Sequence, residues 1–336
     1  MTDSSPAADN ATRSFAGKLA VVTGGASGMG RELVRQLVAE GCSVAACDLN
    51  LQAVEKVAAA AKSDAPPGVL VSAHVCDVAD EAQVLQFRDE VVAHHASDHV
   101  DLVFNNAGMG GGGSFVEDDR DEWERVFAVD WWGVYNCTRA FLPLLMASPE
   151  GVLVNTSSLN GIWAVLGPGM PNTAYSTAKF AVRGFSEALI EDLRTHAPHV
   201  RVAVVMPGHV GTDIVANSFR ARGLPEPERM SDSEVEQVIP PDVRAKLIAA
   251  GVVPENATVD DVRQFLVRMN TDFRDKAPVS AAEAATTILD GVRSGTWRIL
   301  IGEDAKRIDA LVRSRPEAAY DWAELRKAAA AARESP

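Results

Sequence analysis

Tyr175 and Lys179 stand four residues apart, in the stretch Tyr-Ser-Thr-Ala-Lys. In a helix this spacing places both side chains on one face, where a phenol and an ammonium form a pair able to handle a proton. The chain has only three Tyr, so such a pair is rarely expected by chance. Spacing alone is still weak evidence, and the prediction of a catalytic pair depends on the residues that surround it.

A glycine-rich turn occupies residues 23–30, with the sequence Thr-Gly-Gly-Ala-Ser-Gly-Met-Gly. Glycines permit positive φ and let backbone N–H groups approach a pyrophosphate, which the N-terminus of a following helix also attracts. The turn falls between the first predicted strand and the first predicted helix, as in dinucleotide-binding folds. A turn without a ligand is the alternative. We favour nucleotide binding, with these candidate contacts: Gly24, Ser27, Gly28, Met29 and Gly30.

Short apolar runs alternate with helical patterns from Lys18 onward. The runs predict buried strands at residues 19–22, 43–47, 69–73, 101–104, 152–155 and 200–206. The helical spacing covers residues 31–40, 51–63, 81–95, 121–146 and 174–196. Repeated βα units require crossovers, which are almost always right-handed. We therefore predict an α/β fold with a doubly wound (Rossmann) parallel sheet and helices on both faces.

The composition bounds the classes of partner. The chain has 336 residues and 47% hydrophobic content, enough for a full core. Its formal net charge of −14 disfavours nucleic acid and anionic membranes, because both require clustered Lys and Arg. Four cysteines without a C-x-x-C pair predict reduced thiols and a cytoplasmic protein. The histidines lack the spacing of metal ligands, so no metal is predicted.

The chain resembles the short-chain dehydrogenase/reductase family from about Lys18 to Ile214. Its turn has the spacing T-G-x-x-x-G-x-G, not the G-x-G-x-x-G of the usual dinucleotide fingerprint. Five further signatures follow in the order of the family: Cys76-Asp77-Val78, Asn105-Asn106-Ala107-Gly108, Asn155-Thr156-Ser157-Ser158, Tyr175 with Lys179, and Pro207-Gly208-His209-Val210-Gly211-Thr212. The resemblance implies a nicotinamide-dependent oxidoreductase.

Asp48 indicates which nicotinamide cofactor binds. It ends the second predicted strand, where a carboxylate can bind both hydroxyls of the adenosine ribose. The same carboxylate would face the 2′-phosphate of NADP, and two like charges in contact disfavour that cofactor. Neither Ser27 nor Leu49 is the basic residue that NADP-preferring relatives often carry at these positions. We predict NAD. A turn Asp that caps the helix starting at Asn50 is the alternative.

The resemblance also implies the other cofactor contacts. These residues follow successive strands and would enclose the adenine (Asp77, Val78), support the ribose (Asn105, Ala107, Gly108) and bind the nicotinamide carboxamide (Val210, Thr212), with Pro207 and Gly208 in the last motif. Turn and capping roles are the alternatives for these residues.

Oxidation of an alcohol by hydride transfer needs a base, and a free tyrosine with a pKa of about 10 is a poor one at neutral pH. An ammonium about 5 Å away contributes about 3 kcal/mol at an effective dielectric constant of about 20. With the cationic oxidised nicotinamide added, we expect the pKa of Tyr175 to fall to about 7. Lys179 would also bind the nicotinamide ribose. Ser158 would hydrogen-bond the reacting oxygen, and Ser157 competes for that role.

Asp130 departs from the family pattern. The family has N-x-x-G here, and its Asn helps to hold a water that links the catalytic Lys to solvent, whereas this chain has Asp130-Trp131-Trp132-Gly133. A carboxylate still accepts a hydrogen bond from water, but its charge can also pair with Lys179 and weaken the pull on Tyr175. We expect Asp130 to be a working member of the relay. A purely structural helix residue is the alternative.

The remaining segments suggest the domain organisation. We expect a disordered tail at 1–14, one catalytic domain at 15–303 with a substrate lid at about 213–278, and a helical C-terminal extension at 304–336. A subunit contact is the alternative for the lid. The apolar loop at 162–168 predicts either a pocket for a bulky hydrophobic substrate or simple packing.

These predictions combine into one function. The chain is expected to be an NAD-dependent oxidoreductase that interconverts a secondary alcohol and a ketone, and the resemblance suggests a homodimer or homotetramer. The alternative is a catalytically weak dinucleotide-binding sensor or scaffold.

Overall fold

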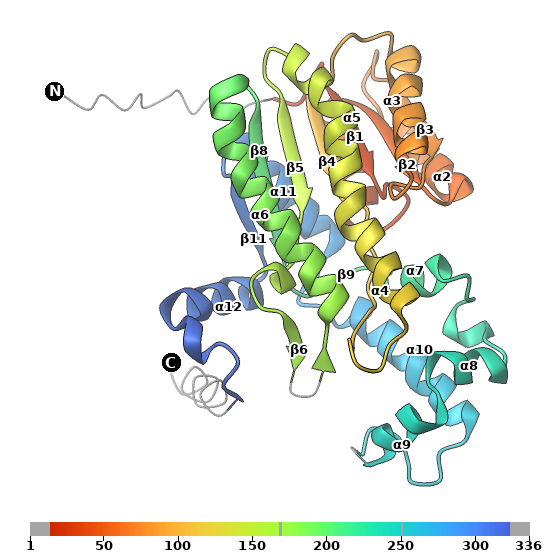
Figure 1. The fold of residues 1–336 in the computed structure, drawn as a ribbon. Coiled ribbons are helices and arrows are strands. Elements are labelled where there is room, and N and C mark those ends of the chain that lie inside the picture. The colour runs from red at the N-terminus through yellow and green to blue at the C-terminus, as the bar shows by residue number, and fades with distance from the viewer. Residues whose placement is uncertain (1–13, 168–169, 250, 323–336) are drawn as a thin grey trace.

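A computed structural model describes residues 14–167, 170–249 and 251–322 (Figure 1). Most of the predicted N-terminal tail, residue 168 of the apolar loop and residues 323–336 of the predicted extension lie outside this range. Seven parallel strands form one sheet in the order β11-β8-β5-β4-β1-β2-β3. Their bounds are Leu19–Thr23 (β1), Ser43–Asp48 (β2), Val71–Val75 (β3), Leu102–Asn105 (β4), Val152–Thr156 (β5), Arg201–Pro207 (β8) and Arg298–Ile301 (β11). The predicted doubly wound sheet is confirmed.

Helices cover both faces of the sheet (Figure 1). One face packs against α1 (Gly28–Ala39), α2 (Leu51–Ser63) and α11 (Ala281–Arg293). The other packs against α3 (Glu81–His95), α5 (Gly133–Ala147) and α6 (Thr173–His196). Because both faces are covered, the central strands consist almost entirely of buried residues, as expected for parallel sheets.

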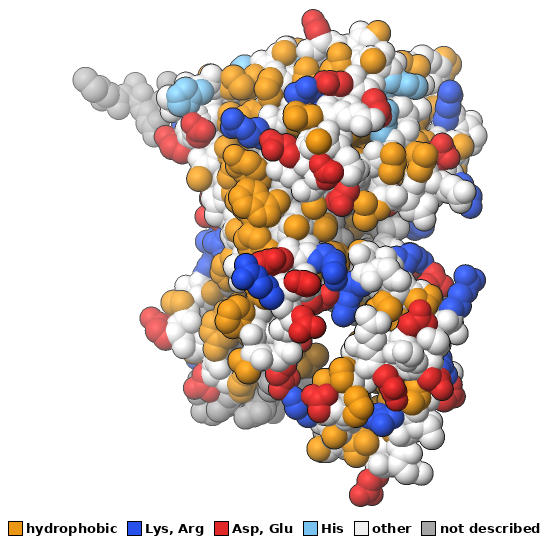
Figure 2. Space-filling model, turned by 45° about the vertical axis from the view of Figure 1, so that its right-hand side comes forward, with side chains coloured by type: hydrophobic (Ala, Val, Ile, Leu, Met, Phe, Trp, Pro, Cys, Tyr) orange, Lys and Arg blue, Asp and Glu red, His pale blue; other side chains and the backbone are white. Residues whose placement is uncertain are grey.

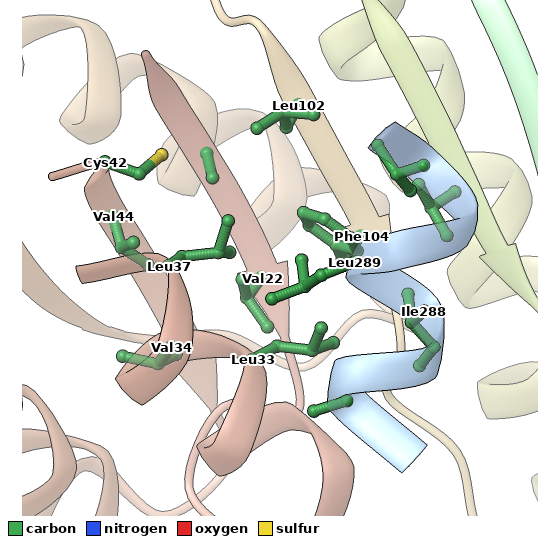
Figure 3. Close-up of a cluster of buried hydrophobic side chains, with 14 of the residues drawn as sticks. Val22, Leu33, Val34, Leu37, Cys42, Val44, Leu102, Phe104, Ile288 and Leu289 are labelled. Carbon is green, nitrogen blue, oxygen red and sulfur yellow. The ribbon is translucent and has the colours of Figure 1, made fainter. Parts of the chain in front are cut away.

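The core between α1, α11 and the sheet brings together segments far apart in the chain. Leu33 and Leu37 of α1 pack beside Val22 and Phe104 of the strands and Leu289 of α11, all at most 1% exposed (Figure 3). Burying a large aliphatic or aromatic side chain contributes roughly 1.5–3 kcal/mol. This packing holds the N-terminus of α1, and with it the glycine-rich turn, at the carboxyl edge of β1.

The structure corrects three of the predicted boundaries. The third strand is Val71–Val75, two residues later than predicted, because Val69 donates its N–H to Pro66 in a turn. The first helix starts at Gly28 and not at residue 31, because the last glycines of the turn already form its first residues. The helix predicted over 121–146 is α4 (Arg120–Phe127), a π-helical turn (Ala128–Trp132) and α5. Such π turns are frequent at functional sites, and this one carries Asp130.

The segment predicted as a lid forms a separate layer beyond the carboxyl edge of the sheet (Figure 1). It starts after β9 (Val210–Gly211), which pairs with β10 (Val279–Ser280). Between them lie α7 (Ile214–Ala221), α8 (Asp232–Val238), α9 (Pro241–Ala249) and α10 (Val259–Asp275). Phe219, Met230 and Leu266 are buried in a small core of this segment's own. This core is separate from the two that cover the faces of the sheet.

Two short strands, β6 (Val165–Gly167) and β7 (Met170–Pro171), pair antiparallel before α6. The chain ends its described part with α12 (Glu303–Ser314) and a 3₁₀ turn at Pro316–Ala318. Within the described residues, no helix combines the length and apolar character that crossing a membrane requires.

Candidate active site

The predicted catalytic residues meet at the carboxyl edge of the sheet. Tyr175 and Lys179 lie in the first turns of α6, and Ser158 lies two residues after the end of β5. Lys179 Nζ lies 5.4 Å from the centre of the Tyr175 ring, close to the separation expected from their spacing. The Ser158 side chain lies near the phenol of Tyr175 and lowers its pKa. A phenol, a hydroxyl and an ammonium thus converge on one point.

The two serines have different partners. The Ser157 hydroxyl is 1% exposed and donates to the backbone carbonyl of Lys179 at 2.7 Å. The Ser158 oxygen faces Tyr175 and accepts the N–H of Asn160 at 3.0 Å. Ser158 is therefore the serine with a hydroxyl directed at the reacting centre, and Ser157 tethers the strand end to α6.

Lys179 forms a buried ion pair with Asp130. Its Nζ lies 2.9 Å from Asp130 Oδ1, and the two side chains are 3% and 0% exposed. The ammonium also donates to the carbonyl of Thr156 at 3.1 Å. Gly108 closes over the pair, because a Cβ there would lie 2.7 Å from Asp130 Oδ1. Lys179 and Asp130 attract each other through their charges, because neither carboxylate oxygen of Asp130 has an aligned hydrogen-bond donor among the described residues.

The pKa of Tyr175 reflects burial as well as the Lys179–Asp130 ion pair. Burial has the largest effect and raises the pKa of Tyr175 above its usual value, as does the charge of Asp130, although Lys179 and Ser158 lower it. Burial alone would lower the pKa of Lys179, but Asp130 and Tyr175 outweigh it and raise that pKa. Burial also raises the pKa of Asp130, against the opposing effect of Lys179. Burial is the largest of these effects on the phenol, and Asp130 offsets part of the opposing effect of Lys179.

A groove of about 830 Å³ runs along the carboxyl edge beside this pair. It passes between β1 and β4, where the strand order reverses, which is the usual ligand position in open α/β sheets. The predicted contacts that line it are Gly24, Ser27, Gly28, Met29, Asp48, Leu49, Asp77, Val78, Ala107, Gly108 and Thr212. Eleven of the predicted positions are thus brought into one continuous groove.

The glycine turn has the form that a pyrophosphate requires. Gly24 and Gly28 have φ of 65° and 52°, values that favour glycine. Ser27 starts α1 without capping it through its side chain, so the first N–H groups of the helix remain available to an anion. A Cβ on Gly24 would lie 2.9 Å from Ala107 Cα, so a larger residue would narrow the groove. These residues fit a nicotinamide dinucleotide.

Asp48 lines the groove and also bonds two backbone N–H groups. Its carboxylate lines the groove and accepts the N–H of Ala26 at 3.2 Å and that of Asn50 at 3.1 Å. It therefore ties the glycine turn to the end of β2 and caps the following turn. The helix cap itself is Asn50, which accepts the N–H of Ala53.

Several predicted contacts are structural and do not line the groove. Asn105 is 2% exposed and donates to Asn155 Oδ1 at 2.8 Å and to Thr138 Oγ1 at 3.0 Å. Gly30 is packed against Gly24 and Asn106, and Val210 belongs to the core. Pro207 and Gly208 end β8, and Gly208 donates to Ile301 at 2.9 Å. These residues shape the edge of the sheet without facing the groove.

Several groove residues were missed from the sequence, among them Asn106, Asn217 and Arg220. Asn106 lines the groove and donates to the carbonyl of Thr23 at 3.0 Å. It belongs to the motif Asn105-Asn106-Ala107-Gly108, in which the side chains of the two adjacent Asn residues point to opposite sides of the backbone. Asn217 and Arg220 of α7 line the far side, and Asn217 donates to Ser27 Oγ at 2.8 Å. No local motif marks them, because tertiary packing alone brings α7 over the turn.

Among the described residues, no group of three His, Cys, Asp or Glu side chains is placed to bind one metal ion. A ring nitrogen of His95 lies 2.9 Å from Ser72 Oγ, and burial lowers the pKa of this ring to about 4.

Comparisons with known proteins agree with this geometry. The family described as "short chain dehydrogenase" matches residues 18–223. A protein of Mycobacterium tuberculosis named "Putative oxidoreductase SadH" is 35% identical over 302 residues, which cover 89% of this chain and 91% of that protein. A short-chain dehydrogenase/reductase from Burkholderia phymatum, solved with NAD, superposes with a TM-score of 0.70 at 25% identity, covering 91% of this chain and 96% of that one.

A metagenomic short-chain oxidoreductase solved with NADP is 30% identical, with a TM-score of 0.52, and covers 58% of this chain and 84% of its own. Solved relatives thus carry either dinucleotide. The chain belongs to the short-chain dehydrogenase family and is an oxidoreductase of that family.

Proposed function

We propose that the protein is an NAD-dependent oxidoreductase that interconverts a secondary alcohol and a ketone, with Tyr175 as the acid/base. The observation that carries this proposal is the convergence of Tyr175, Ser158 and Lys179 beside a groove that fits a dinucleotide. The nicotinamide supplies or accepts the hydride when it is bound. The protein itself has to orient the substrate oxygen and move one proton.

In ketone reduction, Ser158 and Tyr175 both bind the carbonyl oxygen, and Tyr175 donates its phenolic proton as negative charge develops there. Lys179 stabilises the phenolate that remains, and Asp130 keeps the ammonium charged and in place. The raised pKa of Tyr175 means that the proton is present at neutral pH. We therefore propose that the resting site is prepared for reduction, whereas alcohol oxidation requires a higher pH.

The proposed catalyst is tested with Tyr175→Phe. Removing the hydroxyl should lower kcat for ketone reduction by about 10²–10⁴-fold, the usual contribution of a general acid. NADH binding, measured by fluorescence titration, should remain within a few-fold of wild type. A wild-type protein that binds NADH but reduces none of a broad panel of ketones would be the dinucleotide-binding sensor instead.

We propose NAD as the preferred cofactor because Asp48 lines the groove beside Ala26. A carboxylate there binds ribose hydroxyls and repels a 2′-phosphate. The ratio of kcat/KM for NADH to that for NADPH should exceed about tenfold, and Asp48→Ser should reduce it by lowering the repulsion. Equal values for the two cofactors in wild type would refute the preference.

We propose a bulky hydrophobic ketone or alcohol as the substrate. Four apolar side chains are 55–92% exposed beyond the catalytic residues: Phe115, Val116, Leu166 and Met170. They come from the loop before α4 and from the β6–β7 pair. These two segments lie close together, since a Cβ built on Gly113 would be only 3.3 Å from the carbonyl oxygen of Pro171. An apolar rim of this kind suits a substrate with a large apolar surface. We further propose that residues 213–278 act as a lid.

We also propose a homodimer, or a homotetramer built from it, in the cytoplasm. Trp132 and Met146, 47% and 41% exposed, lie on one face with Tyr135 and Phe185. Figure 2 shows hydrophobic side chains gathered on the face that carries α5 and α6. The four cysteines are buried free thiols, a state that favours a reducing compartment.

A further inference from the structure

The loop that carries Ser158 is held from two sides. On the inner side, the 3₁₀ turn Leu159–Gly161 packs against α6, where a Cβ on Gly161 would lie 2.8 Å from the Lys179 carbonyl. Arg183 of α6 donates to the Gly161 carbonyl at 3.3 Å. This side ties the turn to the helix of Tyr175 and Lys179.

The outer side is held by the end of the chain. Trp163 Nε1 donates to the carbonyl of Ala319 at 2.7 Å, and the N–H of Ala164 donates to the Tyr320 hydroxyl at 3.1 Å. The Trp163 ring also packs edge-on against Trp322, with ring centres 5.6 Å apart. Ala319 is 2% exposed. Residues more than 150 positions apart in the chain are thereby joined by two hydrogen bonds and an aromatic contact.

The outer anchor is connected to Ser158 through Asn160. The Asn160 side-chain amide donates to the carbonyls of Trp163 at 3.0 Å and Val165 at 3.2 Å. Its backbone N–H donates to Ser158 Oγ at 3.0 Å. Asn160 is 8% exposed, so these bonds are shielded from water. A displacement of Trp163 therefore changes the orientation of the serine that faces Tyr175.

The end of the chain is itself anchored to the sheet. Asp309 of α12 accepts from Arg298 of β11 at 2.8 Å and from Arg313 at 3.2 Å. Val312 packs against the cluster of Ile162, Val204 and Met206. Figure 1 shows α12 beside the part of the chain between β5 and β6. The anchor is thus a rigid extension of the catalytic domain.

We infer that residues 316–322 form a positioning element of the active site, which orients Ser158 through Trp163 and Asn160. Nothing in the motifs of the family marks this segment, and no residue of it faces the reacting centre. Its role is to fix the angle at which the Ser158 hydroxyl meets the substrate oxygen and Tyr175. The inference rests on the proposed function for its catalytic consequence, but the contact with Ser158 can be tested without it.

The test uses the full-length protein with Trp163→Phe, Tyr320→Phe and the double variant. Each substitution keeps an aromatic ring and removes one hydrogen bond, so folding should be preserved. The matched control is Trp297→Phe, since Trp297 is 42% exposed at the start of β11. Two measurements are made: hydrogen exchange of residues 158–165 by mass spectrometry, and ketone reduction with NADH, using 2-tetralone as the probe.

The double variant should exchange faster at residues 158–165 and lower kcat for the probe about three- to tenfold, while KM for NADH stays unchanged. The alkaline limb of the pH profile should move to higher pH, because a loosened Ser158 no longer lowers the pKa of Tyr175. Tyr320→Phe alone should have a smaller effect in the same direction. Trp297→Phe should change neither measurement.

Three results would overturn the inference: unchanged exchange at residues 158–165, faster exchange with an unchanged kcat and pH profile, or equal effects from Trp297→Phe. A wild-type protein that reduces neither 2-tetralone nor any other ketone contradicts the proposed function instead. In that case the exchange of the Asn160 N–H, which is bonded to Ser158 Oγ, still decides whether residues 316–322 hold the serine.

Discussion

At the scale of single residues, Asp130 sets the electrostatics of the site. The buried ammonium of Lys179 is the cation nearest the phenol among the groups that affect the pKa of Tyr175, and Asp130 lies 2.9 Å from it. A cation and an anion so close act on a third group almost as a neutral dipole. The lysine therefore stabilises a developing phenolate less than it would alone, and burial dominates the pKa of Tyr175.

Asp130→Asn tests this account. Removing the negative charge should lower the pKa of Tyr175, because Asp130 raises it and Lys179 lowers it. Alcohol oxidation needs the phenolate, so its activity should rise at a lower pH than in wild type. Ketone reduction needs the phenol, so its alkaline limb should also move to lower pH. Both profiles are measured with saturating cofactor.

Asp130→Ala should destabilise the fold more than Asp130→Asn. It leaves Lys179 buried without its carboxylate, and breaking a buried ion pair in this way costs about 3–5 kcal/mol of unfolding free energy. Asp130→Asn should lose less, because its amide fills the same space and keeps a polar oxygen beside the ammonium. If Asp130→Ala left turnover and the pH profile as in wild type, Asp130 would be a structural residue and not a relay member.

At the scale of elements, the βα turn after β1 depends on backbones in direct contact. Gly30 lies where a Cβ would be 2.6 Å from Asn106 Nδ2 and would collide with the Gly24 carbonyl. Thr23 Oγ1 accepts the N–H groups of Asn106 and Ala107, both at 3.0 Å. The β1 turn and the β4 loop are therefore one interlocked unit, and the cofactor groove is formed by their contact.

Gly30→Ala should raise the Kd for NADH at least about tenfold, because α1 must move away from the turn that binds the phosphates. Gly184→Ala is the matched control. Gly184 lies within α6, with nothing within 4 Å of its added Cβ, so the substitution should stabilise the helix by about 0.5–1 kcal/mol. Titration and thermal unfolding measure the two effects. Equal Kd values in both variants would mean that the close contact is not needed.

At the scale of the whole molecule, the catalytic helix α6 and the π turn of Asp130 both border the exposed aromatic face. Trp131 packs edge-on against Phe185 of α6, with ring centres 5.5 Å apart. A second copy that covered this face would brace both elements that hold the Lys179–Asp130 pair. A stable interface of this type buries about 1,200–2,000 Å², which two paired helices and their neighbours can supply.

Met146→Glu should convert the proposed dimer to monomers, because it places a charge in the apolar face. The control is Leu85→Glu, a comparable substitution at a 37% exposed residue of α3. Light scattering coupled to gel filtration gives the mass of each variant. A wild-type protein that is monomeric at all concentrations, or a Leu85→Glu variant that dissociates equally, would contradict this arrangement.

The sequence by itself determined the sheet, the glycine turn and the pairing of Tyr175 with Lys179. Each of these follows from local features of the sequence. Apolar residues repeat every two or 3.6 positions in strands and helices, and the turn has glycines where Gly24 and Gly28 adopt positive φ. The choice between neighbouring residues was less certain from sequence, as the buried Asn105 and the groove-lining Asn106 illustrate. Adjacent side chains point in opposite directions, and only the packing decides which direction is the groove.

Tertiary structure alone decided the electrostatics and the outer anchor. The sequence suggested that Asp130 can pair with Lys179, but it did not show that the pair is buried or that burial raises the pKa of Tyr175. The fall to about 7, which includes the charge of the oxidised nicotinamide, stays a prediction. Likewise, Trp163 and Tyr320 are over 150 residues apart, and no periodic pattern links them. Burial and long-range contacts depend on how the elements pack together, which local spacing does not encode.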